Sequence, residues 1–231
     1  MSPETEVLPG VTEAPVTDAE ALLEAHDAYV SNRSYRIDRT SRLIPQSNET
    51  PVRTSSVTIL ADAEGELSLR HTFDAPAQDG NETVVREAWA SEDEDGVFIR
   101  NERWHEQQYE YTPRSTHDFT AVDSIETGLT AMDEFTVTTT HENGVTRYVL
   151  ESDTAPYSYD NGSLRLVVHE AGYVESYRFE YDRGDGDQRE TVVTQVTVDR
   201  VGDPDIDVTQ PEWVPEARAE VGGEANSTDS V

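Results

Sequence analysis

The segment TDAEALLEAHDAYV, residues 17–30, is the one stretch of the chain with a clear helical pattern. Thr17 and Glu20 have the spacing of a capping box, in which both side chains satisfy backbone amides at a helix start. Apolar and aromatic side chains recur every three or four residues and form one stripe, while acidic side chains occupy the opposite face. A helix of this length is marginal alone, so its stripe must pack against the rest of the chain.

Most of the remaining sequence alternates apolar and polar residues, the period of half-buried strands. We therefore predict a mainly β (α+β) fold in which one curved antiparallel sheet packs against the N-terminal helix. Residues 109–111 either end the preceding hairpin or begin another strand. The strands are expected around residues 35–38, 57–59, 67–73, 85–89, 97–104, 135–140, 146–151, 164–168, 173–181 and 192–198.

Residues 113–132 interrupt the alternation. Gly128 and several threonines make this segment a weak helix former. We predict one helix or two short helical turns, forming a lid-like insertion over the sheet. The prediction rests on apolar residues three and four positions apart: Phe119, Val122, Ile125, Leu129 and Met132.

The two ends of the chain differ from the centre in composition. Residues 1–16 contain three prolines and many acidic or small residues, which indicates a flexible tether. Residues 216–231 are small and polar, and we predict a disordered tail there. Between them, residues 17–215 form the folded domain, and the segment QPEWVP (210–215) is expected to dock with Trp213 against one edge of the sheet.

The chain is strongly acidic. It has 48 acidic residues against 17 basic ones, all of them Arg, and a formal net charge of −31. The acids are interspersed with apolar positions, which argues against a disordered acidic region. At molar salt the Debye length is about 3 Å, so repulsion between carboxylates is screened. The composition indicates a halophilic protein, and it disfavours nucleic acid and anionic membrane surfaces as partners.

Asparagine sequons suggest export. Five of the seven Asn residues stand in N-x-Ser/Thr, whereas 42 Ser and Thr among 231 residues predict about one such match by chance. Turn formation is the alternative explanation. The chain has no Cys, no apolar run long enough to span a membrane and no signal-peptide core after Met1. We expect an exported protein whose signal sequence is not part of this chain, glycosylated at Asn32, Asn48, Asn81, Asn161 and Asn226.

No motif points to catalysis or to a metal. The six His residues form neither an HxH nor an HExxH pair, and there is no GxSxG or SxxK sequence. The carboxylates of DRGDGDQRE (182–190) could surround calcium, but their spacing does not match an EF-hand loop and a solvated hairpin turn is the usual explanation. We therefore predict a non-enzymatic protein with no metal and no cofactor.

Several segments, in this order, carry a resemblance to a known group. They are NRSYRI (32–37), VTRYVLES (145–152), LRLVVHEAGYVESYRFEY (164–181), ETVVTQVTV (190–198) and PEWVP (211–215). The chain resembles haloarchaeal surface lipoproteins, which look like the LolA, LppX and RseB group of lipoprotein carriers and lipid-binding sensors. The resemblance covers residues 8–216. It implies an unclosed barrel of about eleven strands with helices in its mouth, a hydrophobic cavity, and a lipidated Cys upstream of the tether that anchors the protein at the cell surface.

The expected function is the binding of a lipid or other hydrophobic ligand in this half-barrel. The alternative is an envelope scaffold or sensor domain with a fully packed core that binds another protein. Large apolar side chains are the candidates to line a cavity, although they could equally form the core. The candidates are Trp89, Phe98, Trp104, Phe119, Met132, Phe135, Leu166, Tyr177 and Phe179.

Overall fold

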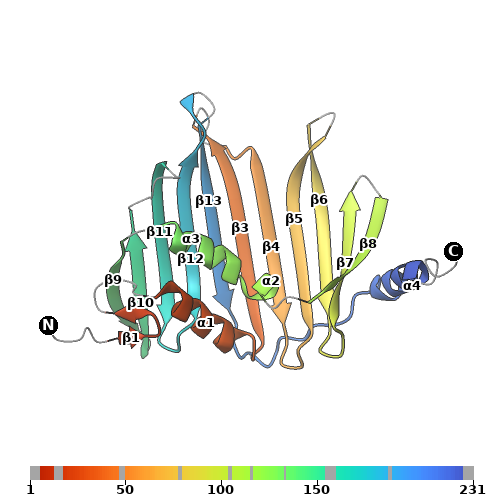
Figure 1. Cartoon of the computed structure of the whole chain (residues 1–231), viewed down its shortest axis with the longest axis horizontal. Helices are drawn as coiled ribbons and strands as arrows, with labels where there is room; N and C mark the ends of the chain where they lie inside the picture. Colours follow the sequence, from red (N-terminus) through yellow and green to blue (C-terminus); the bar gives the residue numbers. More distant parts are fainter. Residues whose placement is uncertain are drawn as a thin grey trace.

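An antiparallel sheet of eleven strands is the frame of the structure (Figure 1). The computed structural model describes residues 6–12, 18–46, 50–77, 80–103, 106–114, 117–132, 134–153, 160–186 and 189–225. The strands are β3 (Tyr35–Pro45), β4 (Arg53–Ala61), β5 (Leu67–Ala77), β6 (Gly80–Ala90), β7 (Gly96–Arg103), β8 (Glu106–Pro113), β9 (Thr136–Glu142), β10 (Val145–Ser152), β11 (Asp160–His169), β12 (Val174–Arg183) and β13 (Glu190–Asp199).

The strand order is β8-β7-β6-β5-β4-β3-β13-β12-β11-β10-β9. Strands that are neighbours in sequence are therefore neighbours in the sheet, except β8 and β9, which lie at opposite edges; at the centre β3 pairs with β13, which is distant from it in sequence. That pairing places Ile37 opposite Val198 and joins the N-terminal and C-terminal halves. The strands β8 and β9 are the two edges, so the sheet stays open. The predicted curved, unclosed antiparallel sheet is confirmed.

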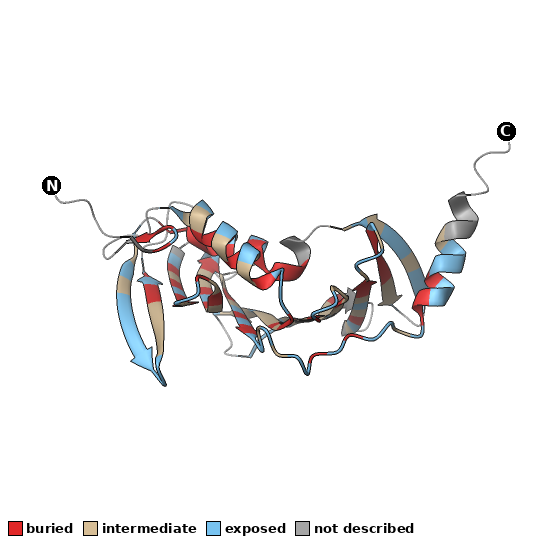
Figure 2. Ribbon diagram, turned by 90° about the horizontal axis from the view of Figure 1, so that it is seen from below, coloured by how far each residue is buried: buried red, intermediate tan, exposed pale blue. Residues whose placement is uncertain are grey.

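Three helices cover one face of the sheet, which we call the helical face. They are α1 (Ala19–Val30), α2 (His117–Thr120) and α3 (Val122–Thr130). Figure 2 shows them on one side of the sheet, while the segment that follows β13 runs along the other side, the outer face, to α4 (Val214–Ala225). Because side chains alternate between faces, each strand contributes every second residue to the core under the helices.

The N-terminal helix forms as predicted, but its cap differs. Asp18 is the N-cap residue, and its Oδ1 accepts a hydrogen bond from the amide of Ala21 at 3.0 Å. Asp18 thus occupies the N-cap position for which the sequence suggested Thr17, and Thr17 itself lies outside the described residues. Asp18 suits this position because its carboxylate both accepts an amide hydrogen bond and interacts favourably with the helix dipole. The buried face comprises Leu22, Leu23, His26 and Val30.

The central insertion forms two short helices, the second of the two alternatives that the sequence left open. Ala121 separates α2 from α3 and has a left-handed backbone with φ of 62°. His26 of α1 links this insertion to the sheet: its Nε2 donates to the carbonyl of Thr120 at 2.8 Å, and its Nδ1 accepts from the amide of Val174 at 3.1 Å. The insertion is anchored by buried side chains: Phe119, Val122, Ile125, Leu129 and Met132.

Both ends of the chain are more ordered than predicted. Residues 6–12 form a small hairpin of β1 (Glu6–Leu8) and β2 (Val11–Thr12), and Leu8 and Val11 are buried in the main core. Residues 216–225 belong to α4. The tether and tail predictions are wrong for these residues because a few apolar side chains within a polar segment suffice to dock it. None of the described helices combines the length and hydrophobicity that a membrane crossing requires.

Gly128 permits the close approach of α3 to the sheet, which gives a first prediction. A β-carbon added there would lie 2.5 Å from Cε2 of Tyr177, far inside van der Waals contact. We expect Gly128→Val to lower the free energy of unfolding by about 1–3 kcal/mol, because the helix must move away from the ring. Urea denaturation measures the change. Thr127→Val, a β-branched substitution at the exposed neighbouring position, should change it by less than about 0.5 kcal/mol.

Candidate ligand cavity

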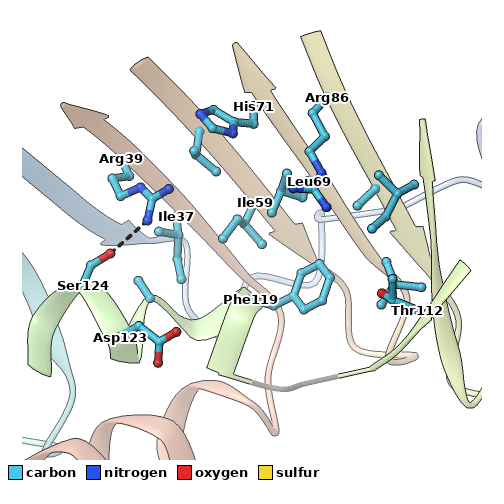
Figure 3. A pocket seen from close by; sticks show the side chains of 15 residues that line it. Ile37, Arg39, Ile59, Leu69, His71, Arg86, Thr112, Phe119, Asp123 and Ser124 are labelled. Atoms are coloured by element: carbon cyan, nitrogen blue, oxygen red, sulfur yellow. Dashed lines mark hydrogen bonds between the residues drawn. The ribbon is translucent and has the colours of Figure 1, made fainter. Parts of the chain in front are cut away.

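A cavity of about 390 Å³ lies on the helical face between the central strands and the α2–α3 insertion (Figure 3). This volume falls within the range of about 300–1,000 Å³ that is typical of small-molecule sites. Strands β3 to β7 supply its floor, and the insertion covers one side with Phe119, Ala121, Asp123 and Ser124. Val97 and Thr112 close the side toward β8.

The floor of the cavity consists of two rows of side chains that cross the strands. The first, which we call the apolar row, joins five residues that are direct partners on successive strands: Ile37, Ile59, Leu69, Ala88 and Ile99. The second row is offset from the first by two residues on each strand, toward the same end of the sheet, and is called here the basic row: Arg39, Val57, His71 and Arg86. Adjacent rows on one face are separated by about 7 Å along the strand. The cavity is therefore apolar on one side and positively charged on the other.

The basic row is tied to its surroundings by two hydrogen bonds. Arg39 Nη1 donates to Ser124 Oγ at 3.0 Å, which joins β3 to α3, as the dashed line in Figure 3 shows. His71 Nε2 lies 2.8 Å from the hydroxyl of Ser55. Burial lowers the pKa of His71, and the positive charges of Arg39 and Arg86 lower it further. Burial also lowers the pKa of Arg39, which remains a cation at any ordinary pH.

The residues predicted to line a cavity fall into separate places. Phe119 lines the cavity itself. Tyr177 and Phe179 line an adjoining hollow of about 260 Å³ that shares Arg39 and Ser124 with it. Met132 and Leu166 are buried in the main core, and Phe135 lies beside a separate hollow between β9 and β11. Trp104 lies outside the described residues. Whether any of them contacts a ligand stays a prediction.

The prediction that Trp89 and Phe98 line the cavity is wrong, because both side chains point away from it. Their sequence neighbours Ala88 and Ile99 line it, and alternation along a strand therefore directs Trp89 and Phe98 to the outer face. There they form a second core with the segment that follows β13. The other buried members of this second core are Ile206, Val208, Trp213, Val214 and Ala217.

The segment around Trp213 docks near an edge of the sheet, although on its outer face. The Trp213 indole stacks on the ring of Tyr109 in the edge strand β8, with centroids 6.2 Å apart. The guanidinium of Arg100 lies 5.7 Å from the Trp213 ring. Pro215 in the first turn of α4 is compatible with a helix start, because the amides of that turn need no intrahelical partner.

Two predicted sequons lie on described, exposed backbone. The Asn32 side-chain amide donates to the carbonyl of Ala28 at 3.0 Å and closes the last turn of α1. The Asn161 amide donates to Asp182 Oδ2 at 3.0 Å. Asn81 is in β6, but its side chain is outside the described set, as are Asn48 and Asn226. Glycosylation at these positions stays a prediction.

The acidic stretch 182–190 begins near the end of β12 with Asp182, whose carboxylate has hydrogen-bond and ion-pair partners within the protein. Burial favours a higher pKa for Asp182, but hydrogen bonds from Thr191 and Asn161 and the charge of Arg189 outweigh it and lower the pKa. Asp187 lies outside the described residues. In the part of the chain that the structure describes, no group of three or more His, Asp or Glu side chains is placed to hold a metal ion.

Comparisons with known proteins give only distant matches. No protein-family model matches the chain, and no curated protein is similar in sequence. Among solved structures, LprF from Mycobacterium bovis shares 11% identity over 86% of this chain and 98% of its own, with a TM-score of 0.43. A putative outer membrane lipoprotein-sorting protein domain from Vibrio parahaemolyticus shares 12% over 88% and 99%, with a TM-score of 0.33. MucB in complex with MucA(peri) shares 9% over 79% and 94%, with a TM-score of 0.17. At these identities and TM-scores the matches assign neither a family nor a function to this chain.

Proposed function

We propose that this protein is exported, is held at the cell surface and binds a lipid or other hydrophobic ligand in the cavity of its open half-barrel, without catalysing a reaction. The observation that supports the proposal is the apolar row, a continuous strip of aliphatic side chains that the α2–α3 insertion covers on one side only. Leu69 in this row remains partly exposed. An apolar surface of this kind gains about 25 cal/mol per Å² when a ligand removes it from water.

The chemistry around the cavity supports binding rather than turnover. Ser55 and His71 form the arrangement nearest to a nucleophile and its base, with 2.8 Å between Oγ and Nε2. Within the described residues, no carboxylate makes a hydrogen bond to the other ring nitrogen of His71, so the group that orients the base in a triad is missing. The flanking arginines also lower the pKa of His71, which weakens it as a base.

Native mass spectrometry of protein purified from its own host, followed by denaturing extraction, tests this function. We expect an apolar molecule to be released on denaturation and hexose masses at the sequons. A bare polypeptide mass with nothing released would contradict the proposal of a glycosylated carrier. p-Nitrophenyl dodecanoate tests the non-enzymatic part, and turnover that disappears in Ser55→Ala would overturn it.

Filling the cavity gives a second prediction. We expect Leu69→Trp to weaken the binding of dodecanol about tenfold or more, because the larger side chain occupies the space above the apolar row. Tryptophan fluorescence or calorimetric titration measures the affinity. Thr72→Trp is the matched control, because Thr72 lies on β5 with its side chain on the outer face. Equal loss of affinity in both variants, or in neither, would place the binding elsewhere.

A protein-binding function is the second candidate, and the edge strand β9 favours it. Six of its seven residues are exposed, so its outer row of backbone amides and carbonyls is available to an added strand. This candidate gains weight if denaturation releases no apolar molecule and if Leu69→Trp leaves dodecanol binding unchanged. Binding of a partner would then show as protection of β9 amides from hydrogen exchange.

A further inference from the structure

The basic row carries positive charge in a protein whose net charge is strongly negative. Acidic residues outnumber basic ones by 48 to 17 in the chain. The cavity lining reverses this ratio, because it contains the guanidinium groups of Arg39 and Arg86 and one carboxylate, that of Asp123. Asp123 is exposed on α3, and in Figure 3 its carboxylate points away from Arg39. An anion that enters this cavity therefore meets a local positive charge in a protein that otherwise repels it.

The arginines of the basic row also differ from several arginines of the outer face. These are paired with carboxylates, as in Arg36 with Asp38 at 2.7 Å and Arg165 with Glu151 at 3.1 Å. Arg70 and Arg100 both contact Glu87. Among the described residues, neither Arg39 nor Arg86 has a carboxylate within ion-pair distance, and the hydrogen-bond partner of Arg39 is the neutral hydroxyl of Ser124. The charge of Asp123 acts on Arg39 through space and raises its pKa against the larger effect of burial, but the basic row has no ion pair with a described carboxylate.

The geometry of the row suits one compact anionic group. His71 and Arg86 are direct partners on β5 and β6, and Arg39 lies two strands beyond His71. With about 4.8 Å between strands, the backbones of Arg39 and Arg86 are separated by about 14 Å. Guanidinium side chains are long enough to reach a group above His71 from that distance once they turn toward it; in Figure 3 Arg39 points toward Ser124 and the Arg86 side chain runs separately from it. Arg39 is partly buried, and a buried cation without a counter-ion is unfavourable.

We propose that Arg39, His71 and Arg86 bind the anionic headgroup of an amphiphile, a carboxylate, phosphate or sulfate, while its hydrocarbon chain lies along the apolar row. This inference rests on the proposed function and specifies its ligand class. The two rows are neighbours on one face, so a headgroup in the basic row places the first carbons of the chain directly above Ile59 and Leu69. Charge-assisted hydrogen bonds from guanidinium groups to such an anion are among the stronger polar contacts in proteins.

A matched pair of probes tests the headgroup site in the full chain. Dodecanoate and dodecanol have the same chain length and differ in charge, and both are titrated by calorimetry at one fixed ionic strength. We expect dodecanoate to bind about tenfold or more tightly than dodecanol, and Arg86→Gln to remove most of that preference. Arg39→Gln should do the same. Arg42→Gln is the control, because it removes the same charge from an exposed position on the outer face of β3 and should leave both affinities unchanged.

The outcomes separate this inference from the function on which it rests. If both probes bind equally and Arg86→Gln changes neither affinity, the headgroup site is overturned while the hydrophobic function stands. If neither probe binds, the proposed function fails together with it. If acetate or inorganic phosphate alone competes with dodecanoate at similar concentrations, the site binds free anions and the amphiphile is overturned. Circular dichroism and the unfolding midpoint of each variant verify that the fold is retained.

Discussion

Trp213→Ala is expected to lower the free energy of unfolding by about 3–5 kcal/mol, the usual cost of truncating a large buried aromatic side chain. The indole is 7% exposed although it belongs to an irregular segment outside the sheet. It packs in the second core beside Trp89, which is 2% exposed. Removing it leaves a cavity on the outer face of β6 to β8 and exposes apolar surface of the second core.

Urea denaturation of the wild type and the variant measures this effect, and Tyr111→Ala is the matched control. Tyr111 is an aromatic residue of the same edge strand as Tyr109, and its ring contacts Phe98 with centroids 4.9 Å apart. It is 41% exposed, so its truncation should cost only about 1 kcal/mol. If Trp213→Ala costs no more than Tyr111→Ala, the segment after β13 does not belong to the cooperative unit.

The hydrogen bonds of Asp62 explain why Trp213→Ala should have a large effect on stability although Trp213 lies in an irregular segment. Asp62 is 8% exposed, and its Oδ1 accepts from the amides of Glu64 and Glu66 in the β4–β5 turn. Its Oδ2 accepts from the amide of Val208 at 3.2 Å. One buried carboxylate thus joins the turn to the C-terminal segment, which positions that segment so that Trp213 reaches the second core.

The sequence predicted the strands and the N-terminal helix correctly, but it did not predict the structure of the segments near the two ends of the chain. The strands and the N-terminal helix follow from periodicities of two and about three and a half residues, which are local properties. The hairpin of residues 6–12 and helix α4 depend instead on a few side chains, Leu8, Val11 and Trp213 among them, docking on surfaces that exist only in the folded sheet. Composition alone gives such polar segments the appearance of disorder.

The sequence analysis predicted a hydrophobic cavity in the half-barrel, but it did not identify most of the residues that line it. Selection by side-chain size favoured Trp89 and Phe98, whereas the alternation along β6 and β7 directs their smaller neighbours Ala88 and Ile99 to the helical face. That parity was readable in the sequence. The apolar and basic rows were not, because they depend on the register between five consecutive strands, and the alternation within one strand does not determine that register.

His26→Leu is expected to lower the free energy of unfolding by about 2–6 kcal/mol at neutral pH. The imidazole is fully buried and is the only side chain with described hydrogen bonds to both Thr120 and Val174, one to each ring nitrogen. Leucine fills a similar volume but leaves the Thr120 carbonyl and the Val174 amide buried without these partners, at about 1–3 kcal/mol each. The loss should appear as a lower urea midpoint with an unchanged slope.

The same hydrogen bonds predict how stability depends on pH. Nε2 donates and Nδ1 accepts, so the folded state requires neutral His26, and burial lowers the pKa of this imidazole below 6.5 despite the opposing effects of Thr120 and Asp27. Below pH 6.5 the unfolded chain binds a proton that the folded chain excludes, and the free energy of unfolding should fall by up to about 1.4 kcal/mol per pH unit until the folded pKa is reached. Above pH 6.5 the contribution is fully present.

Titration between pH 7 and pH 5 at constant molar salt isolates this histidine, because most carboxylates stay ionised there and their repulsion is screened. His71→Asn is the matched control, because burial also lowers the pKa of His71 but the ring is only partly buried. We expect His26→Leu to flatten the dependence of stability on pH and His71→Asn to retain most of the wild-type slope. If His26→Leu keeps the full slope, the loss of stability belongs to other groups, and the hydrogen bonds of His26 do not require its neutral form.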